Sequence, residues 1–412
     1  MTDAVRFDPF SPEAMADPGQ AYGDLRAACP FHHRPAEGET PEFYVLSDHA
    51  EIKDDILKGS EVWAFRFGNA MKDSISDVGF KTDGAFHAAF RMVVQRGLTP
   101  AAVRNWRPRI EAIVDERIDA MLAMPEGQGD FHALFALPLP ARMMCLMLGA
   151  PEADYENYKR WSDTLQFLTF GDPQPGSYET VLQEIYPHFS ALIDERRALL
   201  AAAGIEEPDL SHLGTVLPDD FMSRGLVATV EGRRLTQEEI LNICLAFLTG
   251  GQETTTNLIG HLMRRLLEEP SRWEQLKNDP SLIEAAIEES LRYDPPVLAH
   301  FRTSVQPTTM HGHDIADHSK LMFSICGANR DPAVFENPDE FRIDRPVTEA
   351  KQHLSFGSGV HFCLGAPVAR LEARITLEKL IERMPNLALL DVGERVRTWM
   401  YWGHTGIQVS WS

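Results

Sequence analysis

The most informative stretch of this chain runs from Phe356 to Gly365 and reads FGSGVHFCLG. Its single cysteine, Cys363, follows two glycines and precedes a third, and helix-forming residues come directly after it. At the start of a helix, the dipole and the free N–H groups favour the thiolate form of a cysteine. Glycine lets the backbone come close to whatever the sulfur binds. The pattern therefore indicates a reactive thiol or a metal ligand, although a lone buried cysteine is usually only a small apolar residue.

A second unusual stretch, GGQETTT at residues 250–256, interrupts a long apolar segment. Thr236 and Glu239 form a capping box, and the apolar pattern predicts one helix from there to about Leu267. Two adjacent glycines in a helix interior cost about 1 kcal/mol each relative to alanine. One interpretation is close packing against a neighbouring helix. The other is a locally opened helix face that a planar ligand approaches, with Thr254 bonded inside a distorted turn and Glu253 supplying protons.

A third pattern places Glu289 and Arg292 three residues apart on a predicted helix. Such pairs are common on solvated helix faces, so the pattern alone is weak evidence. The buried stripe of this helix includes Ile287 and Leu291, and Arg292 lies beside it. A structural ion pair is the interpretation that this position favours.

These three patterns, in this order, resemble the cytochrome P-450 family. FGSGVHFCLG matches every fixed position of the family's haem loop, FGxGxHxCxG. GGQETT resembles the oxygen-activating helix motif, and Glu289-x-x-Arg292 matches the ExxR motif. Residues 329–345 resemble the meander before the cysteine loop, and the recognisable similarity covers about 83–100 and 225–372. One departure is Gly250, where the family often has alanine, and it should widen the space over the haem slightly.

The resemblance implies a role for each matching residue. Cys363 is the expected thiolate ligand of the haem iron. Glu253 and Thr254 are the expected acid–alcohol pair that delivers protons to dioxygen. The haem contacts that it implies include four propionate partners (His87, Arg91, Arg302 and His361), together with Gly250, Phe356, Gly357 and Gly365. Glu289 and Arg292 are expected to tie their helix to the meander through Arg345.

The expected fold class is mainly α with minor β. The resemblance implies the cytochrome P-450 fold, with a long central helix over the haem and the cysteine loop beneath it. Further helices are predicted at 183–202, from 279 to about 294, and from 367 to about 384, with short strands in 302–325 and at the C-terminus. Residues 1–412 are expected to form one domain with no fused reductase or ferredoxin domain.

Composition excludes several classes of function. The chain has 412 residues, of which 44% are hydrophobic and 24% charged, as in globular proteins. A formal net charge of −22 argues against a nucleic-acid partner. No membrane span is expected, because no run of 18 apolar residues occurs. Five cysteines without a CxxC pair and an N-terminus without a signal-peptide pattern predict a cytoplasmic protein with reduced thiols.

The expected function is a haem-thiolate monooxygenase that contains haem b. It inserts one atom of O2 into a small hydrophobic substrate, aromatic or terpenoid-like, with electrons from a separate ferredoxin and ferredoxin reductase. A peroxide-using haem-thiolate enzyme and a haem sensor are alternatives, which the retained Glu253 and Thr254 disfavour. A non-haem hydrolase with Cys363 and His361 as nucleophile and base is a third alternative. Two residues apart before a helix, these side chains are expected to diverge.

Substrate contacts are expected where the similarity is lowest, at about 62–80, 153–180, 246–250 and 297–301. The specific expectations are Ala246, Thr249, Val297 and Leu298. The apolar residues that suggest a hydrophobic substrate are Trp63, Phe65, Phe67, Phe167, Phe170, Val297, Leu298 and Phe301.

A basic segment is the expected docking surface for the ferredoxin. Between Gly84 and Ile110 the chain has no Asp or Glu but has five arginines: Arg91, Arg96, Arg104, Arg107 and Arg109. The resemblance places this segment on the Cys363 side of the haem, where Arg370 and Arg374 add positive charge. A local positive field would steer an acidic ferredoxin towards an otherwise acidic protein.

Overall fold

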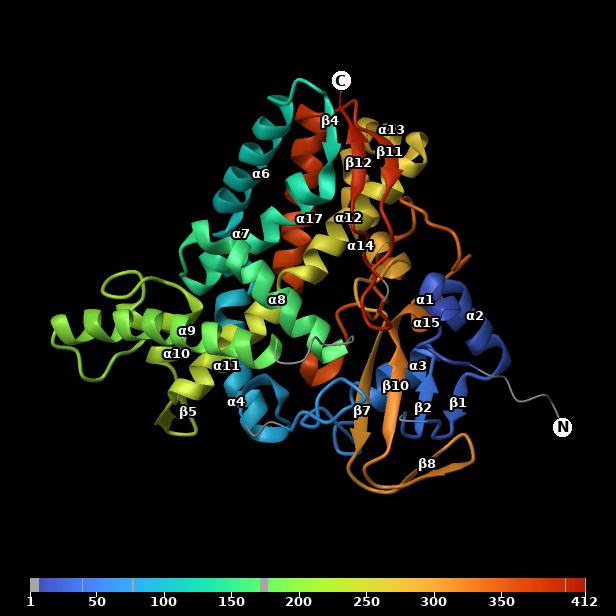
Figure 1. Cartoon of the computed structure of the whole chain (residues 1–412), viewed down its shortest axis with the longest axis horizontal. Helices are drawn as coiled ribbons and strands as arrows, with labels where there is room; N and C mark the ends of the chain where they lie inside the picture. Colours follow the sequence, from blue (N-terminus) through green and yellow to red (C-terminus); the bar gives the residue numbers. More distant parts are fainter. Residues whose placement is uncertain (1–6, 39, 76–77, 171–176, 397, 412) are drawn as a thin grey trace.

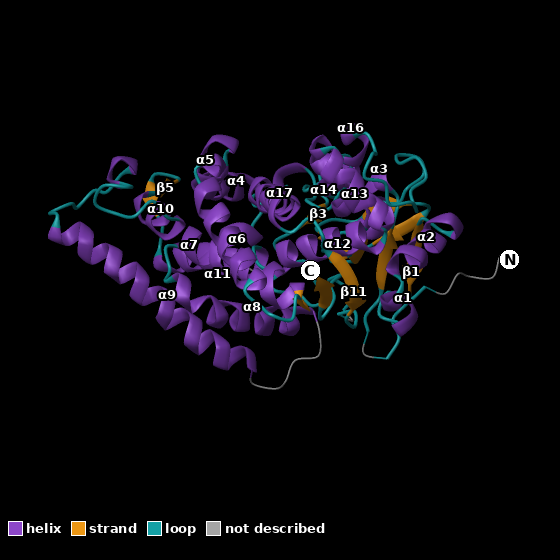
Figure 2. Ribbon diagram, turned by 90° about the horizontal axis from the view of Figure 1, so that it is seen from above, coloured by secondary structure: helices purple, strands orange, loops and turns teal. Residues whose placement is uncertain are grey.

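The computed structural model describes residues 7–38, 40–75, 78–170, 177–396 and 398–411, and only the backbone at 167–170 and 177–178. A helical part occupies one side of the molecule and a sheet part the other (Figures 1 and 2). Within the described residues, no helix is long and apolar enough to cross a bilayer. The α-helices are α1 (Pro12–Ala16), α2 (Pro18–Ala28), α3 (His49–Glu51), α4 (Gly84–Gln95), α5 (Pro100–Arg104), α6 (Arg107–Leu122), α7 (Pro138–Leu148), α8 (Tyr155–Phe170), α9 (Ser177–Ala202), α10 (Phe221–Val227), α11 (Gln237–Gly250), α12 (Glu253–Glu268), α13 (Pro270–Asn278), α14 (Ile283–Tyr293), α15 (Ile325–Ala328), α16 (Val347–Ala350) and α17 (Ala366–Arg383).

The largest sheet has five strands in the order β1-β2-β10-β7-β3. The β10–β2 pair is parallel and the other pairs are antiparallel. A three-stranded sheet (β11-β12-β4) and two hairpins (β5-β6 and β8-β9) complete the β structure. The strands are β1 (Phe31–Arg34), β2 (Phe43–Leu46), β3 (Trp63–Ala64), β4 (Gln128–Asp130), β5 (Thr229–Val230), β6 (Arg233–Arg234), β7 (Ala299–Ser304), β8 (Thr308–Met310), β9 (His313–Ile315), β10 (Lys320–Ser324), β11 (Ala388–Val392) and β12 (Ile407–Ser410).

The predicted mainly α class with minor β is confirmed, and so is most of the predicted helix pattern. The helix predicted at 183–202 begins earlier, at Ser177. The helix predicted from 279 begins as a 3₁₀ turn, Pro280–Leu282, which leads into α14. The predicted hairpin in 302–325 is β8–β9, and β7 and β10 flank it within the large sheet.

The single long helix predicted for 236–267 is wrong, because the chain forms two helices there. The capping box is present: Thr236 Oγ1 accepts from Glu239 N, and Thr236 N donates to Glu239 Oε2. Helix α11 then ends at Gly250, and α12 begins at Glu253. Adjacent glycines weaken helix propagation, so a break costs less free energy here than elsewhere in the segment.

The helical part contains the largest hydrophobic core, to which α6, α7, α12, α14 and α17 all contribute. Helix α12 contacts both α14 and α17, whereas Gly250 and Gly251, at the break between α11 and α12, are exposed. Helix α17 begins directly after the cysteine loop. The core therefore fixes the positions of the two motifs that the sequence singles out.

Candidate active site

The cysteine loop is a set of tight turns that ends at α17. Cys363 N donates to the Phe356 carbonyl oxygen at 2.8 Å, and Gly357 N donates to Leu354 O at 2.8 Å. Gly357 and Gly359 have φ values of +69° and +68°, which glycine adopts without strain. A Cβ at Gly359 would lie 2.5 Å from the Leu57 carbonyl oxygen, so only glycine fits there.

Among the described residues, Cys363 is the one exposed cysteine, while Cys145, Cys244 and Cys326 are buried and Cys29 is half-buried. Burial among neighbouring protein atoms raises the pKa of the Cys363 thiol. The backbone N–H groups of Gly365 and Ala366 act in the opposite direction. A Cβ at Gly365 would lie 3.8 Å from the sulfur. The loop thus presents one sulfur, with N–H groups behind it and no bulky neighbour at Gly365.

The four predicted propionate partners form one cluster. The His87 and His361 rings lie 4.1 Å apart. The Arg302 guanidinium lies 4.5 Å from the Phe65 ring centre, and Phe65 lies 4.8 Å from His361. Arg91 donates to the Phe362 carbonyl oxygen, next to Cys363. Residues from three other segments therefore meet at the cysteine loop: Phe65, helix α4 and strand β7.

This basic cluster has little negative charge of its own. Burial lowers the pKa of Arg302 to about 10, with Asp83 acting in the opposite direction. Burial, with the His361 and Arg91 charges, lowers the pKa of His87 to about 4. Asp83 is the one acidic group in contact with the cluster within the described part of the chain. The basic cluster would be completed by carboxylates, and the Cys363 thiol by a metal ion. Haem has two propionate carboxylates and an iron, so these residues fit haem.

The break between α11 and α12 leaves backbone carbonyls without helical partners, and side chains satisfy two of them. Thr254 Oγ1 donates to Gly250 O at 2.9 Å. Gln166 Nε2, from α8, donates to Thr249 O at 3.1 Å. A Cβ at Gly250 would meet nothing within 4 Å. Thr254 is thus bonded inside a distorted turn, and the helix face at Gly250 is open.

Glu253 is the first residue of α12, and its carboxylate has two partners. Oε1 accepts from Asn257 Nδ2 at 3.1 Å, and Oε2 lies 3.3 Å from Lys159 Nζ of α8. Lys159 also pairs with Asp163. Burial opposes the charge of Lys159, but Glu253 and Asp163 raise the pKa of its ammonium group. Glu253 is 18% exposed and therefore has access to solvent protons.

The predicted substrate contacts differ in their surroundings. Ala246 and Thr249 are half-buried on α11, and Thr249 Oγ1 donates to Leu245 O. Val297 is half-buried and forms a β-bridge with Tyr401. Leu298 points the other way, into a core with Met322 and Trp402, because neighbouring residues of extended chain face opposite sides. Its burial in that core gives no support for the expected substrate contact.

The aromatic residues that suggested a hydrophobic substrate mostly serve other purposes. Trp63 and Phe301 are buried in the cores on the two faces of the large sheet. Phe67 is buried and contacts His318. Phe65 belongs to the basic cluster. The side chains of Phe167 and Phe170 lie outside the described residues.

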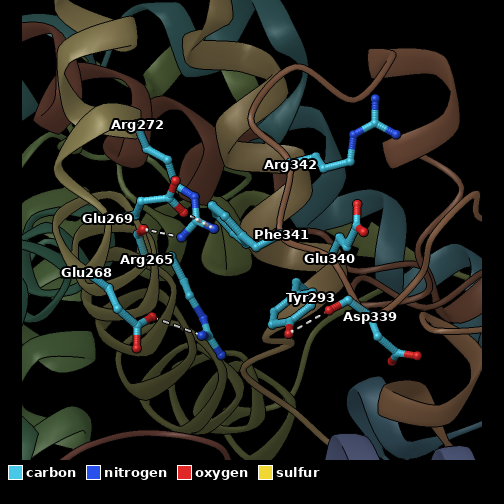
Figure 3. A pocket seen from close by; sticks show the side chains of 9 residues that line it. All are labelled: Arg265, Glu268, Glu269, Arg272, Tyr293, Asp339, Glu340, Phe341 and Arg342. Atoms are coloured by element: carbon cyan, nitrogen blue, oxygen red, sulfur yellow. Dashed lines mark hydrogen bonds and ion pairs between the residues drawn. The ribbon is translucent and has the colours of Figure 1, made fainter.

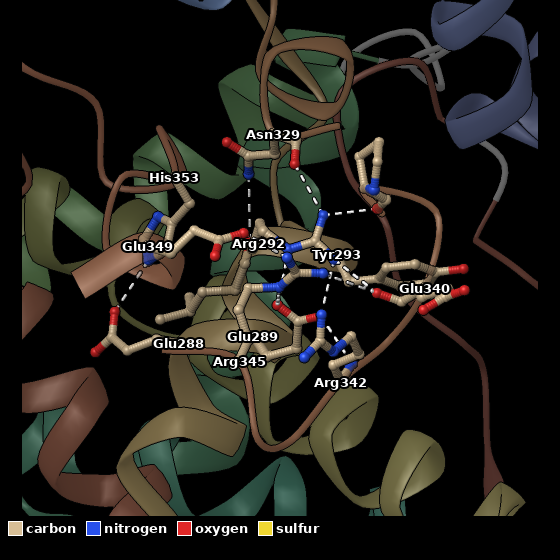
Figure 4. A network of polar contacts seen from close by, with 12 residues as sticks. Glu288, Glu289, Arg292, Tyr293, Asn329, Glu340, Arg342, Arg345, Glu349 and His353 are labelled. Atoms are coloured by element: carbon tan, nitrogen blue, oxygen red, sulfur yellow. Dashed lines mark hydrogen bonds and ion pairs between the residues drawn. The ribbon is translucent and has the colours of Figure 1, made fainter. Parts of the chain in front are cut away.

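The ExxR residues form a buried network, as predicted (Figure 4). Glu289 Oε2 accepts from Arg292 Nε at 2.7 Å and from Arg345 Nε at 2.8 Å. Arg292 also donates to the carbonyl oxygens of Asn329, Pro338 and Glu340. These bonds tie α14 to residues 329–345, so the role predicted for Glu289, Arg292 and Arg345 is confirmed.

A surface hollow of about 550 Å³ lies elsewhere, at the C-terminal end of α12 (Figure 3). Its charged residues largely pair with one another: Arg265 with Glu268, and Arg272 with Glu269. None of the residues predicted for the active site lines it. We assign no role to this hollow.

Sequence reasoning missed three residues of the site, Asp83, Lys159 and Asn257. It associated Phe65 with the substrate, whereas the structure places Phe65 in the basic cluster. Asp83 directly precedes the helix that carries His87 and Arg91, a position at which aspartate usually caps a helix. That signal was available in the sequence. Asn257 lies one helical turn after Glu253, which was also readable. The positions of Lys159 and Phe65 depend on tertiary packing.

Several known proteins are similar to this chain. The family model "Cytochrome P450" matches residues 38–385. The cytochrome P450 monooxygenase PikC of Streptomyces venezuelae is 34% identical over 93% of this chain and 88% of its own length. Erythromycin C-12 hydroxylase of Saccharopolyspora erythraea is 36% identical over 76% of this chain and 74% of its own length.

Solved structures share the whole fold. Cytochrome P450 CREJ in complex with (4-ethylphenyl) dihydrogen phosphate superimposes with a TM-score of 0.84 at 27% identity, over 98% of this chain and 99% of that one. A mutant of P450 EryK in complex with erythromycin B gives a TM-score of 0.81 at 31% identity, over 96% and 97%. The fold that the resemblance implied is therefore confirmed.

Proposed function

Because this chain belongs to the cytochrome P450 family and is a haem b monooxygenase, we propose that the described residues divide the work of that reaction as follows. Cys363 holds the iron through its sulfur, and the N–H groups of Gly365 and Ala366 stabilise the thiolate. When bound, the haem supplies the iron at which dioxygen is activated. The observation that carries this assignment is the exposed residue Cys363 beside a basic cluster whose one acidic contact within the described residues is Asp83.

The basic cluster holds the edge of the cofactor. His87, Arg91, Arg302 and His361 bind the two propionates, which replace the water lost by these buried groups. Phe65 lies between Arg302 and His361 and excludes water from them. Phe356 and Gly357 shape the turn in front of Cys363, and Gly250 leaves the opposite face open.

Glu253 and Thr254 move protons to the oxygen side of the site. Glu253 reaches solvent, and Lys159 and Asn257 hold its two oxygens. Thr254 Oγ1 donates to the Gly250 carbonyl oxygen, so its own lone pairs remain available to accept a proton donor. Retention of this pair favours use of O2 over use of peroxide.

The substrate is an apolar molecule that contacts Ala246, Thr249 and Val297. We propose a small aromatic or terpenoid-like compound, to whose site Trp63, Phe67 and Phe301 do not contribute because they are core residues. One observation favours a second candidate, a larger polyketide. Curated relatives include erythromycin C-12 hydroxylase and mycinamicin IV hydroxylase/epoxidase, at 36% and 33% identity.

The electrons come from a redox partner, and we propose a ferredoxin that docks on α5 and the start of α6. Arg96, Arg104 and Arg109 are exposed and have no ion pair within the described residues. Arg107, by contrast, pairs with Glu111 and Glu378. Arg370 and Arg374 pair with Glu288 and Glu284, so they add less positive charge than the sequence suggested.

A binding screen tests the substrate proposal. The holoprotein is titrated with small aromatic compounds, terpenoids, steroids and erythromycin-type polyketides, and loss of the water ligand of the iron is followed in the visible spectrum. Hits are then incubated with a ferredoxin, its reductase, NADH and ¹⁸O₂. We expect one ¹⁸O atom per product molecule. Product that carries no ¹⁸O, or turnover only with added peroxide, would refute the monooxygenase assignment.

A further inference from the structure

Asp83 joins three segments of the chain at one carboxylate. It occupies the capping position before α4, yet its side chain makes no capping bond to that helix. Instead, Oδ2 accepts from Phe65 N and Arg66 N, both at 2.9 Å. Oδ1 lies 3.0 Å from His361 Nε2, and because a carboxylate only accepts, the imidazole donates. The loop before α4, the start of α4 and the cysteine loop therefore meet at Asp83.

The same contacts immobilise the His361 ring. Phe65 packs against it at 4.8 Å and 56°, and His87 at 4.1 Å and 39°. Nε2 is bonded to Asp83, which leaves Nδ1 without a hydrogen-bond partner within the described residues. The ring thus presents one nitrogen at the edge of the cluster that we assign to the haem propionates.

The carboxylate is well suited to this position. Its side chain is 17% exposed, so its hydrogen bonds are only weakly screened by solvent. Burial opposes ionisation, but His361 and the backbone N–H groups of Arg66 and Phe65 lower the pKa of Asp83. Loss of the carboxylate would leave two backbone N–H groups and the imidazole without their acceptor, and such losses are costly where water is scarce.

We propose that Asp83 is a positioning residue for the haem: it fixes the His361 imidazole at the cofactor edge and holds the Phe65–Arg66 backbone against it, and thereby slows release of the haem. This inference rests on the proposed function, because it assumes that the basic cluster binds the propionates. In this proposal, Asp83 contacts neither the substrate nor the iron.

Haem transfer to excess apomyoglobin tests the inference on the holoprotein. We expect Asp83→Ala to release haem at least tenfold faster than wild type. Asp83→Asn should be intermediate, because its amide oxygen still accepts from Phe65 N and Arg66 N but the charge is gone. Removal of a negative charge near the iron should also raise the reduction potential in both variants. Asp83→Glu should restore part of the retention.

Asp48→Ala is the matched control, because Asp48 caps α3 through Glu51 N and does not contact the cysteine loop. Its haem release and potential should equal those of wild type. Wild-type release and potential in both Asp83→Ala and Asp83→Asn would overturn the inference. If Asp83→Ala does not fold, Asp83→Asn decides. A wild-type protein without thiolate-bound haem would refute the proposed function instead.

Discussion

At the scale of single residues, the cofactor side of the site combines an exposed cysteine with basic groups that have little negative charge nearby within the described residues. Cys363 is exposed while three other cysteines are buried. Burial lowers the pKa values of Arg302 and His87, because there is little negative charge nearby. Unpaired buried charges cost free energy, so a protein retains them where a ligand completes them.

Thr254 is the residue whose hydroxyl we assign to proton delivery. Thr254→Ala should consume NADH at a similar rate but release mostly peroxide, because the donor beside Gly250 is lost. Product formed per NADH is the measurement, with a substrate from the binding screen. Thr256→Ala is the control, because that hydroxyl is buried on the same helix and has no hydrogen-bond partner within the described residues. Unchanged coupling in Thr254→Ala would contradict the assignment.

Glu372 is a buried carboxyl group whose Oε2 has no hydrogen-bond partner within the described residues. Burial raises its pKa from 4.5 to about 8. Between pH 4.5 and about pH 8, the Glu372 side chain is deprotonated in the unfolded chain but stays protonated in the folded chain. The free energy of unfolding therefore falls as the pH rises. Glu372→Gln removes this penalty.

We therefore expect Glu372→Gln to be more stable than wild type at pH 8, by on the order of 4 kcal/mol. The difference should shrink as the pH falls to 4, where both forms are uncharged at this position. Urea unfolding at pH 4, 6 and 8 measures this dependence. A stability difference that does not change with pH would show that the carboxyl group has another partner.

At the scale of elements, the break between α11 and α12 is the feature that sequence reasoning described only partly. GGQETTT indicated an opened helix face and a bonded Thr254, and both are present. The predicted single helix was wrong, because the partner that satisfies the Thr249 carbonyl, Gln166, comes from α8. The residues 236–267 alone could not predict this contact, because Gln166 lies outside them.

Replacement by alanine should change the stability of the protein in opposite directions at the two glycines of the break. A Cβ at Gly250 would meet nothing within 4 Å. Gly250→Ala should therefore raise the free energy of unfolding by about 0.5–1 kcal/mol, because alanine has the higher helix propensity. A Cβ at Gly251 would lie 3.0 Å from the Phe247 carbonyl oxygen. Gly251→Ala should therefore lower the free energy of unfolding by about 1 kcal/mol. Chemical denaturation of both variants makes the comparison. Equal effects would mean that the break does not depend on this backbone contact.

At the scale of the whole molecule, long-range contacts decide what the sequence can reveal. The cysteine loop and the ExxR pair were readable because each occupies consecutive or helically spaced positions. The partner of His361, Asp83, is 278 residues away in the chain. Trp63 and Phe301 looked like substrate contacts but fill the cores of the sheet part, since apolar character alone does not distinguish a core from a binding site.

The charge of the whole molecule matters for the redox partner. With a net charge of −22, the protein repels an acidic ferredoxin except where positive charge is exposed. Arg104→Glu/Arg109→Glu should slow electron transfer from the ferredoxin at least tenfold at low ionic strength and flatten its salt dependence. Stopped-flow reduction kinetics measure both.

The control for this docking surface is Arg197→Glu/Lys277→Glu, which makes the same charge change on α9 and α13, where the partners Asp194 and Glu274 are exposed. It should alter transfer much less. Substrate affinity should be unchanged in both double variants. Equal slowing in the two would place the effect in the net charge and not in a docking surface.

The most direct test of the central claim is the spectrum of the reduced, CO-bound protein. Wild type should show the red-shifted Soret band of thiolate-ligated haem. Cys363→Ala should lose that band, while single replacements of Cys29, Cys145, Cys244 and Cys326 should keep it. A thiolate-type band that persists in Cys363→Ala would contradict the assignment of Cys363 as the ligand of the haem iron.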